Sequence, residues 1–479
     1  MRGRALLTAL LVLGSTQIGD PGTVVAQPVN EVTPLNDADL TAREVLRDVQ
    51  RFYLPLQITR EKVLQNQAKL LEKQGVFDTV IKGKAEVQPL GYYQHVILDA
   101  EVRQPTAFWG TDFFAGYRLG NGLGKNGFAD YDGKKETLNL GEWRVGLNTS
   151  LLQNRDIDDR RATLSLLSLD IERAEMDLLA KQLLYLQDGL EAYWKWRALA
   201  QKELVATELL ERAQIKVDQL QAEVDVGKTA PIYVTENLRS IYKRQQKLLE
   251  IQQDRQAALL KLRLYLDPTR SIPETPDPVP LIDSCVPLAG VDAAQRQALQ
   301  QRPEVLAVAL QQQQNDIGLQ LAQNLRWPVL DLYFQLSQDI GEGDKSDKET
   351  EALGGVKFYY PPALRKAQGQ LDRLDSIERA LAAQLAFARQ RIIQDIQTQR
   401  VKRDFSCLKA QLAEKEVIVA EQVAAAERER FELGSSTLFT VNLREEEAAE
   451  ARLRYVDALM VYWMADSTYP LILGLLPRN

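Results

Sequence analysis

The side chains that most often carry catalysis or bind metals are scarce in this chain of 479 residues. His95 is the only histidine, and no nucleophile pattern surrounds it, so we expect it to lie on the surface. Cys285 and Cys407 are the only cysteines, and their wide separation does not match the paired spacing of a zinc site. The sequence therefore predicts no enzyme, no cofactor and no metal site.

The glycine-rich residues 116–124 are the nearest approach to a phosphate-binding loop. Such a loop needs a helix that begins with lysine and a hydroxyl residue directly after the glycines. No such helix follows here, so we interpret the stretch as an ordinary loop. The function must then depend on architecture rather than on a reactive centre.

Two glycine turns indicate that the chain is a tandem duplication. Residues 226–234 and 433–441 each lie between two long helical patterns, at an offset of 207 residues. The matching positions are Gly227 with Gly434, Val234 with Val441, and Gln187-Asp188 with Gln394-Asp395. Because the offset holds along a whole helix, we infer two copies of one architecture.

The helical patterns are too long for an ordinary globular core. In residues 164–193 and 371–396 apolar side chains recur every three or four positions, as an amphipathic helix requires. A helix of about 70 residues spans roughly 100 Å at a rise of ~1.5 Å per residue. This pattern favours coiled-coil packing, and an ordinary core stripe is the alternative.

Each half has the same predicted order of helix, β region, long helix, glycine tip and helix. The first repeat covers residues 27–266 with its β region at 76–154, and the second covers 292–479 with its β region at 327–360. Residues 267–291 lie between the two repeats and contain six prolines. Their composition predicts a linker or a belt lying across the helices.

The β regions contain four alternating segments. These strand candidates are residues 79–90, 140–153, 329–338 and 353–360. The first region is about twice as long as the second and holds the aromatic stretches 89–93 and 108–114. Those aromatics form either a girdle at a membrane interface or the packing of a long loop.

Residues 1–26 have the features of a secretory signal peptide. Arg2 and Arg4 precede the apolar run 5–13, and residues 24–26 offer small side chains for cleavage. A short membrane anchor is the alternative, but this run is far below the ~20 residues that a spanning helix needs. Removing the segment changes the formal net charge from −7 to −8, which attracts neither nucleic acid nor an anionic membrane surface.

Several phrases of the sequence resemble the TolC-like family of outer-membrane efflux and secretion channels. They are Arg302-Pro303-Glu304 at a helix start, residues 327–332 (Trp-Pro-Val-Leu-Asp-Leu) entering a strand, and residues 431–437 (Phe-Glu-Leu-Gly-Ser-Ser-Thr) at the second turn. Their order and duplication extend the resemblance over nearly all of the mature chain. The implied fold is mainly α, with long coiled-coil helices in a periplasmic α-barrel and a transmembrane β-barrel.

The resemblance implies a homotrimer in the outer membrane that extends into the periplasm. Each chain would give four strands to a shared twelve-stranded barrel, which agrees with the physical need to close open sheet edges in lipid. The implied partners are a periplasmic adaptor, an inner-membrane transporter and outer-membrane lipid, without nucleic acid. The implied function is a passive export duct; the alternative is a periplasmic coiled-coil adaptor.

The two tips and the helices behind them are the candidate functional positions. The resemblance implies that an adaptor binds at the tips, formed by Gly227, Lys228, Thr229, Gly434, Ser435 and Ser436. We expect Thr229 and Ser436 to cap the returning helices.

The predicted periplasmic entrance lies one or two turns beyond the tips. Its candidate residues are Tyr233, Glu236, Thr440 and Leu443. Family channels often place aspartates at two of these positions, and this chain has Thr440 and Leu443 there, so an aspartate gate is not implied. Glu236 either forms a ring of carboxylates or is a solvated charge on a helix face.

The two cysteines are candidates for a disulfide bond. The belt is expected to cross the helices at mid-height, which brings Cys285 near Cys407 in an oxidising compartment. A buried pair of free thiols is the alternative.

Overall fold

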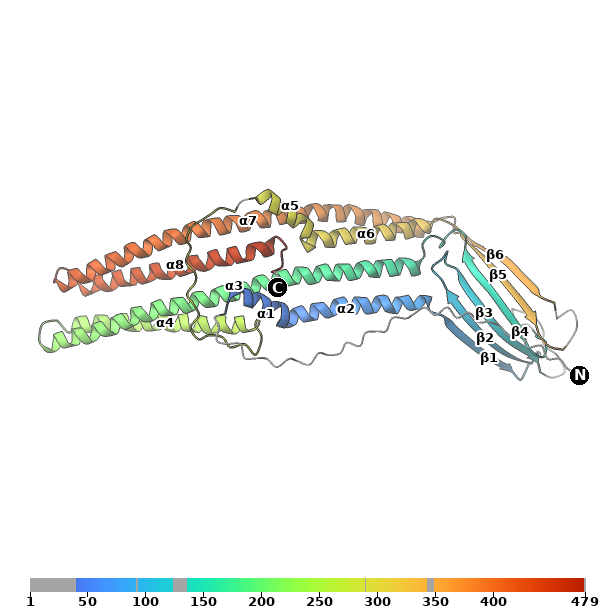
Figure 1. The fold of residues 1–479 in the computed structure, drawn as a ribbon, viewed down its shortest axis with the longest axis horizontal. Helices are drawn as coiled ribbons and strands as arrows, with labels where there is room; N and C mark the ends of the chain where they lie inside the picture. The colour runs from blue at the N-terminus through green and yellow to red at the C-terminus, as the bar shows by residue number, and fades with distance from the viewer. Residues whose placement is uncertain (1–39, 92–93, 124–135, 289, 343–348, 478–479) are drawn as a thin grey trace, which may run out of the picture.

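The computed structural model describes residues 40–91, 94–123, 136–288, 290–342 and 349–477. The molecule is a long rod in which the helices form most of the length and one antiparallel sheet forms one end (Figure 1). The mainly helical class with a single sheet is confirmed. The predicted signal peptide, residues 1–26, lies outside the described residues.

The first half begins with two helices in line, α1 (Ala42–Phe52) and α2 (Leu54–Gln74). The Thr41 side chain accepts from the backbone N–H of Glu44, whose carboxylate accepts from the backbone N–H of Thr41. This capping box fixes the start of α1. Pro55 lies in the first turn of α2, where its missing N–H breaks no helical bond.

The second half begins in the same way, with α5 (Val291–Gln301) and α6 (Pro303–Asn324). The break between them lies at Arg302-Pro303, within the phrase that the sequence places at a helix start. Pro303 cannot donate to a carbonyl of α5, and its ring disfavours a helical conformation at Arg302. The chain therefore bends at this point and restarts as α6.

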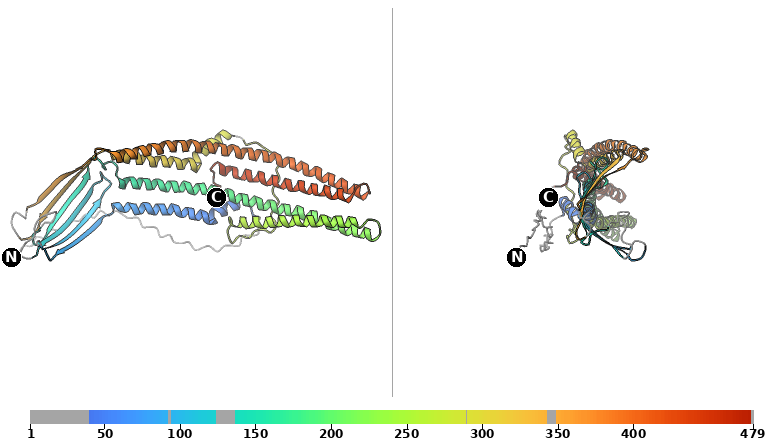
Figure 2. Two further views of the ribbon diagram at one scale, coloured as in Figure 1. Left: turned by 180° about the vertical axis from the view of Figure 1, so that it is seen from behind. Right: turned by 90° about the vertical axis from the view of Figure 1, so that its right-hand side faces the viewer.

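Two long hairpins form the end of the rod opposite the sheet (Figure 1). Their helices are α3 (Asp159–Asp225), α4 (Ile232–Arg263), α7 (Arg365–Glu432) and α8 (Leu438–Ile472). The end-on view in Figure 2 shows that the helices and the sheet follow one curved wall.

The main hydrophobic core lies at mid-height, where α1, α3, α4 and α8 meet. Its fully buried side chains include Leu186, Leu190, Tyr193, Trp196, Leu262 and Leu459. Gly189 allows α1 to approach α3, because a Cβ at this position would lie 2.8 Å from Cγ2 of Val49. The core therefore joins the start of the first half to the middle of the long hairpins, whereas α5 and α6 pack on Ile392 and Ile396 of α7 in a smaller cluster.

The proline-rich segment between α4 and α5 crosses this core as an extended belt (Figure 1). Arg197 of α3 donates to the backbone oxygens of Asp277 (3.0 Å) and Pro278 (2.6 Å). From α8, the indole nitrogen of Trp463 donates to the backbone oxygen of Pro280 (2.7 Å). Side chains of both halves thus satisfy backbone carbonyls that have no helical partner.

The belt is also bonded covalently to the second half. Cys285 of the belt and Cys407 of α7 form a disulfide, with their Cα atoms 5.8 Å apart. Next to it, Arg403 donates to the backbone oxygen of Val286 (3.1 Å) and pairs with Asp466 of α8 (2.6 Å). The belt, α7 and α8 are thereby fixed together.

The sheet contains six strands in sequence order, all antiparallel. They are β1 (Val80–Gln88), β2 (His95–Pro105), β3 (Asp112–Gly122), β4 (Glu142–Ser150), β5 (Val329–Asp339) and β6 (Glu351–Tyr359). The expectation of four strands per chain, and of twelve in three chains, is wrong. Residues 76–154 form four strands rather than two, because the β2–β3 hairpin fills the region assigned to loops.

The six-stranded sheet also corrects two local interpretations of the sequence. Residues 116–122 belong to β3 and are not a loop; Gly116 leaves room for the side chain of Arg144 from β4. His95 is not on the surface, because it is 2% exposed and lies 3.2 Å from the Glu86 carboxylate. Of the aromatics, Phe113 and Phe114 lie in β3, and Phe108 stacks on Trp109 in the turn before it.

Candidate functional site

The sheet has one apolar face and one polar face. Directly paired residues point to the same side, so the strand register defines both faces. The apolar face includes Ile81, Val87, Val96, Leu98, Val102, Phe113, Leu119, Trp143, Val145, Leu147, Leu332, Phe334, Leu336, Val356 and Phe358. The polar face includes Lys82, Lys84, Glu86, Asp99, Glu101, Arg103, Arg118, Glu142, Arg144, Asn148, Asp331, Gln335, Ser337, Asp339, Glu351 and Lys357.

Charges of opposite sign alternate across the polar face. One row of directly paired positions runs through Lys84, Asp99, Arg118 and Glu142, on β1 to β4. The Arg118 guanidinium lies 2.7 Å from the Glu142 carboxylate, whose side chain is 1% exposed. Opposite charges at paired positions stabilise a sheet, so this row holds β1 to β4 in register.

Arg144 of β4 extends this network across a whole strand. Its guanidinium passes over Gly116 of β3 and lies 2.5 Å from Asp99 and 3.7 Å from Glu101, both on β2. A Cβ at Gly116 would lie 3.1 Å from Nε of Arg144, so a side chain there would obstruct the crossing. The glycine in β3 therefore lets three strands share one ion-pair cluster.

The two edge strands, β1 and β6, are much more exposed than the inner strands. β1 follows α2 and runs away from the helices, whereas β6 runs back toward α7. The two edges are thus antiparallel to each other and have no strand partner on their outer sides within the described sheet. Such edges can pair with another copy of the chain.

At the other end of the molecule, both tips have the same backbone structure. Gly227 has φ +75°, and the backbone N–H groups of Gly227 and Lys228 donate to the carbonyls of Val224 and Glu223, both at 2.9 Å. This is the Schellman arrangement, in which a glycine with positive φ satisfies the last helical carbonyls. The second tip repeats it with Gly434 at φ +73°.

The hydroxyl groups of the tips do not serve as the expected helix caps. The Thr229 hydroxyl donates to Glu223 (2.8 Å), and α4 begins after Pro231 without a side-chain cap. In the second tip Ser436 bonds to Glu427, and Thr437 caps α8. Both predicted caps instead bind acidic side chains of the preceding helix. Lys228 lies 2.7 Å from Glu223, and this ammonium group with the Thr229 hydroxyl lowers the pKa of Glu223.

Each tip exposes two large apolar side chains that the sequence analysis did not single out. They are Val226 (77%) and Ile232 (58%) in the first tip, and Leu433 (77%) and Phe439 (69%) in the second. The two pairs are related by the same 207-residue offset, which is the signal that could have identified them. Exposed apolar groups at equivalent positions are typical of a contact surface.

The structure brings together only two of the four predicted entrance residues. Glu236 of α4 and Leu443 of α8 line a hollow of about 230 Å³ with Phe439. Tyr233 and Thr440 do not line it. Glu236 is exposed, with Lys243 and Glu446 also lining the hollow.

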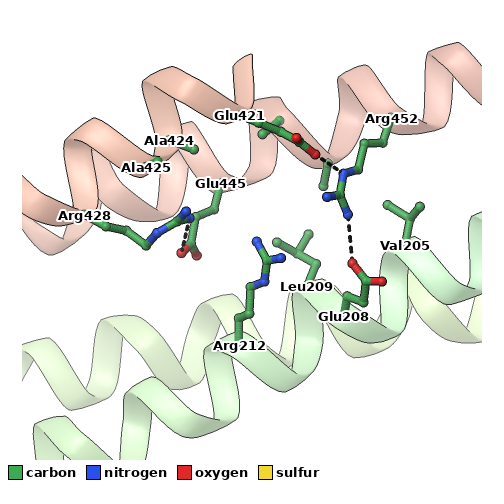
Figure 3. Close-up of a pocket in the computed structure, with 12 residues that line it drawn as sticks. Val205, Glu208, Leu209, Arg212, Glu421, Ala424, Ala425, Arg428, Glu445 and Arg452 are labelled. Atoms are coloured by element: carbon green, nitrogen blue, oxygen red, sulfur yellow. Dashed lines mark hydrogen bonds and ion pairs between the residues drawn. The ribbon is translucent and has the colours of Figure 1, made fainter. Parts of the chain in front are cut away.

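Further from the tips, ion pairs connect the two hairpins (Figure 3). Arg452 of α8 lies 2.8 Å from Glu208 of α3 and also bonds to Glu421 of α7. Together with Arg212, Arg428 and Glu445 these side chains surround a space of about 270 Å³ between α3, α7 and α8. The hairpins are therefore separated here by a charged space rather than by an apolar core.

Arg244 of α4 is the most deeply buried cation of this region. It donates to the backbone oxygen of Leu209 (2.9 Å) and lies 3.5 Å from Glu445, whose other oxygen faces Arg428. Burial lowers the pKa of Arg244, although the Glu445 carboxylate opposes that shift. The buried ion pair thus connects the returning helices of both hairpins.

No helix among the described residues is both long and apolar enough to cross a membrane. Within the same residues, no group of histidine, cysteine and acidic side chains is arranged to hold a metal ion.

Comparison with known proteins agrees with this geometry. Residues 125–267 match the family model described as outer membrane efflux protein. Solved structures of outer-membrane channels match almost the whole chain. This chain has the TolC-like fold. No curated protein matches the sequence.

Three solved structures illustrate the likeness of the TolC-like chain. A membrane protein from Pseudomonas aeruginosa has 12% identity and a TM-score of 0.66 over 90% of both chains. The outer membrane protein VceC from Vibrio cholerae has 13% identity and a TM-score of 0.64 over 91% of this chain and 97% of that one. The CmeC outer membrane channel of Campylobacter jejuni has 13% identity and a TM-score of 0.63 over 91% and 86%.

Proposed function

We propose that the chain is one subunit of a homotrimeric duct that exports cargo through the outer membrane. The observation that carries this proposal is the two-faced sheet with two open, antiparallel edges. Its apolar face suits lipid and its polar face suits a water-filled lumen. An open edge in lipid leaves backbone groups unsatisfied, so the sheets of several copies must close on one another.

The proposed placement follows from the two ends of the rod. The sheet lies in the outer membrane and the helices extend into the periplasm, after removal of residues 1–26 as a signal peptide. The chain then consists of a first repeat (27–266), the belt (267–291) and a second repeat (292–479). The paired helices form the wall of a tunnel that leads to the sheet.

The tips are the proposed binding surface for a periplasmic adaptor, which couples the duct to an inner-membrane transporter. Three copies would present six tips on one rim, each with an exposed apolar pair and a glycine whose position has open space beside it. The transporter supplies the energy, because the chain contributes no predicted catalytic centre. At the entrance the proposed carboxylate is Glu236, with Leu443 beside it.

The alternative of a periplasmic adaptor is less well supported. An adaptor would need one hairpin and compact β domains in water, whereas this chain has two hairpins and a single sheet. That sheet exposes Ile81, Leu98, Phe113, Val356 and Phe358 on one face. An apolar surface of this size is unfavourable in water and favourable in lipid.

Membrane insertion is tested by a matched pair of arginine variants. Leu98→Arg places a charge on the apolar face and costs ~2–4 kcal/mol if that face contacts lipid. Gln335→Arg places the same charge on the polar face and should assemble normally. Cell fractionation and native mass measurement should find wild type and Gln335→Arg as outer-membrane trimers, with Leu98→Arg reduced. A soluble monomer of the wild type would refute the proposal.

Adaptor binding at the rim is tested at Gly434. Gly434→Ala and Gly434→Trp share the strain of a side chain at positive φ, but only Trp adds bulk at the rim. We expect Gly434→Trp to abolish export and Gly434→Ala to retain it, with trimers formed by both. Normal export by assembled Gly434→Trp would exclude this rim as the adaptor site.

A further inference from the structure

The strand number of the sheet can be compared with the number of helices attached to it. Four helices join the sheet directly: α2 before β1, α3 after β4, α6 before β5 and α7 after β6. Six strands therefore continue four helices in each chain. In a closed duct the two parts of the wall must have compatible circumferences.

Simple geometry shows that these numbers match. Neighbouring helices lie 8–10 Å apart, so four of them occupy about 32–40 Å of circumference. Strands lie ~4.8 Å apart and tilt by about 35–45° in membrane barrels, so each occupies about 5.9–6.8 Å of circumference. Six strands then occupy about 35–41 Å, whereas four would occupy only about 23–27 Å.

The β2–β3 hairpin accounts for the difference. β1 runs away from the helices and β4 returns to them, so the two could pair directly through a short turn. Inserting one antiparallel hairpin between them adds two strands without changing either direction. The hairpin carries Asp99, Glu101 and Arg118 on the polar face, and Arg144 of β4 reaches across β3 to Asp99 of β2. Its charges are thus integrated with those of β4.

We propose that β1 of one copy pairs with β6 of the next and closes a barrel of eighteen strands that is as wide as the helical tunnel. This inference rests on the proposed trimer. The backbone walls are then about 35 Å apart, compared with roughly 24 Å for twelve strands at the same tilt. The outer-membrane exit is not the narrowest part of the duct, and hydrophilic cargo is selected by size at the helical end.

The polar face fits a wide aqueous lumen rather than a side-chain-filled one. Barrels of 16–18 strands enclose water, whereas small barrels are filled by side chains. The charges of the polar face neutralise one another in pairs, such as Arg118 with Glu142 and Arg144 with Asp99. Such a wall is hydrated along its length and retains neither anions nor cations strongly.

The first experiment measures lumen width from the barrel side. Glu101→Cys places a thiol on the polar face of β2, and Val102→Cys places one on the apolar face as a matched control. Maleimides carrying polyethylene glycol of increasing size are added outside cells that contain the assembled trimer. We expect Glu101→Cys to react with polymers about 1.5 times wider than a twelve-stranded barrel admits, and Val102→Cys to remain unlabelled.

The second experiment removes the hairpin. Deleting residues 91–139 leaves a four-residue turn between Gln88 and Glu142, which both belong to the polar face. The deletion chain should still form trimers, and polymer exclusion from the barrel side should fall by about one third in diameter. If this chain does not assemble, the Glu101→Cys measurement decides the question alone.

The outcomes separate this inference from the proposed function. A trimer that inserts in the membrane but excludes all polymers wider than a twelve-stranded barrel admits would overturn only the wide exit. A membrane-inserted dimer, with twelve strands in total, would overturn it as well. A chain that never reaches the membrane would refute both proposals.

Discussion

The two halves of the chain agree in their helices and differ in their strands. α3 has 67 residues and α7 has 68, α2 has 21 and α6 has 22, and α1 and α5 have 11 each. In contrast, four strands lie between α2 and α3 and only two between α6 and α7. Helix length is constrained because each long helix packs against several others: α3 contacts α2, α4, α6 and α8, and α7 contacts α6 and α8. The sheet accepts an extra hairpin because antiparallel strands can be added in pairs.

The belt is joined covalently to the second half alone, and this asymmetry gives the largest expected effect. Cys285→Ser with Cys407→Ser opens a loop closed over a sequence separation of 122 residues. The chain-entropy model predicts a loss of ~4–5 kcal/mol, expressed as a lower thermal midpoint of the oxidised protein.

Reducing agent supplies the control for that measurement. It should lower the midpoint of the wild type toward that of the double variant and leave the variant unchanged. Equal midpoints of wild type and variant without reductant would mean that the bond contributes nothing to stability.

The buried ion pair between the hairpins should have the next largest effect. Arg244→Met leaves Glu445 buried with its ion pair to Arg428 alone, and breaking a buried pair costs ~3–5 kcal/mol. Lys243→Met removes an exposed pair with Glu446 and should cost less than ~1 kcal/mol. Hydrogen exchange of α4 amides measures the destabilisation in both variants. Equal destabilisation would show that burial of the Arg244 ion pair adds nothing to stability.

A glycine in the first half corresponds to isoleucine in the second. Gly189 and Ile396 are related by the 207-residue offset, and both lie in buried positions. Gly189→Ile should destabilise by ~1–3 kcal/mol, because its Cβ would collide with Val49. Gly369→Ile in α7, where a Cβ meets no atom within 4 Å, serves as the control. Chemical denaturation measures both variants. Similar midpoints for the two would contradict the close approach of α1 to α3.

The smallest predicted effect is a pH dependence of the first tip. Lys228 and Thr229 lower the pKa of Glu223 below its ordinary value of 4.5. Because the folded pKa is depressed, this contact stabilises the turn above the ordinary pKa and is lost as the pH falls through the folded value. Hydrogen exchange of the Lys228 amide should rise over that range in wild type and not in Glu223→Gln. Identical profiles would show that the contact does not hold the turn.

The helical framework could be predicted because each helix has a strong local pattern. Repeated apolar spacing and the glycine turns indicate α3, α4, α7 and α8 without knowledge of their partners. Pro55 marks the break before α2 for the same local reason. The existence and order of these elements therefore follow from short-range physics.

The β2–β3 hairpin could not be recognised as easily, because the contacts that explain its residues are made with other strands. Gly116 resembles loop composition, yet it is required where Arg144 crosses to Asp99. Thr229 looked like a helix cap, but Glu223 in the preceding helix binds its hydroxyl. His95 lacks any catalytic pattern, and its burial beside Glu86 depends on strand register. The errors at Gly116 and His95 concern contacts that only tertiary structure defines, whereas the error at Thr229 concerns a competing contact six residues away in the same tip.

The near-equal lengths of α3 and α7 also set the distance of the two tips from the sheet. One inserted residue would raise a tip by about 1.5 Å and rotate everything beyond it by roughly 100° around the helix. Even an insertion of seven residues, which nearly restores the rotation, would leave one tip standing about 10 Å above its neighbour. A level rim therefore allows length changes in the hairpins only when both helices of each hairpin and both halves change together.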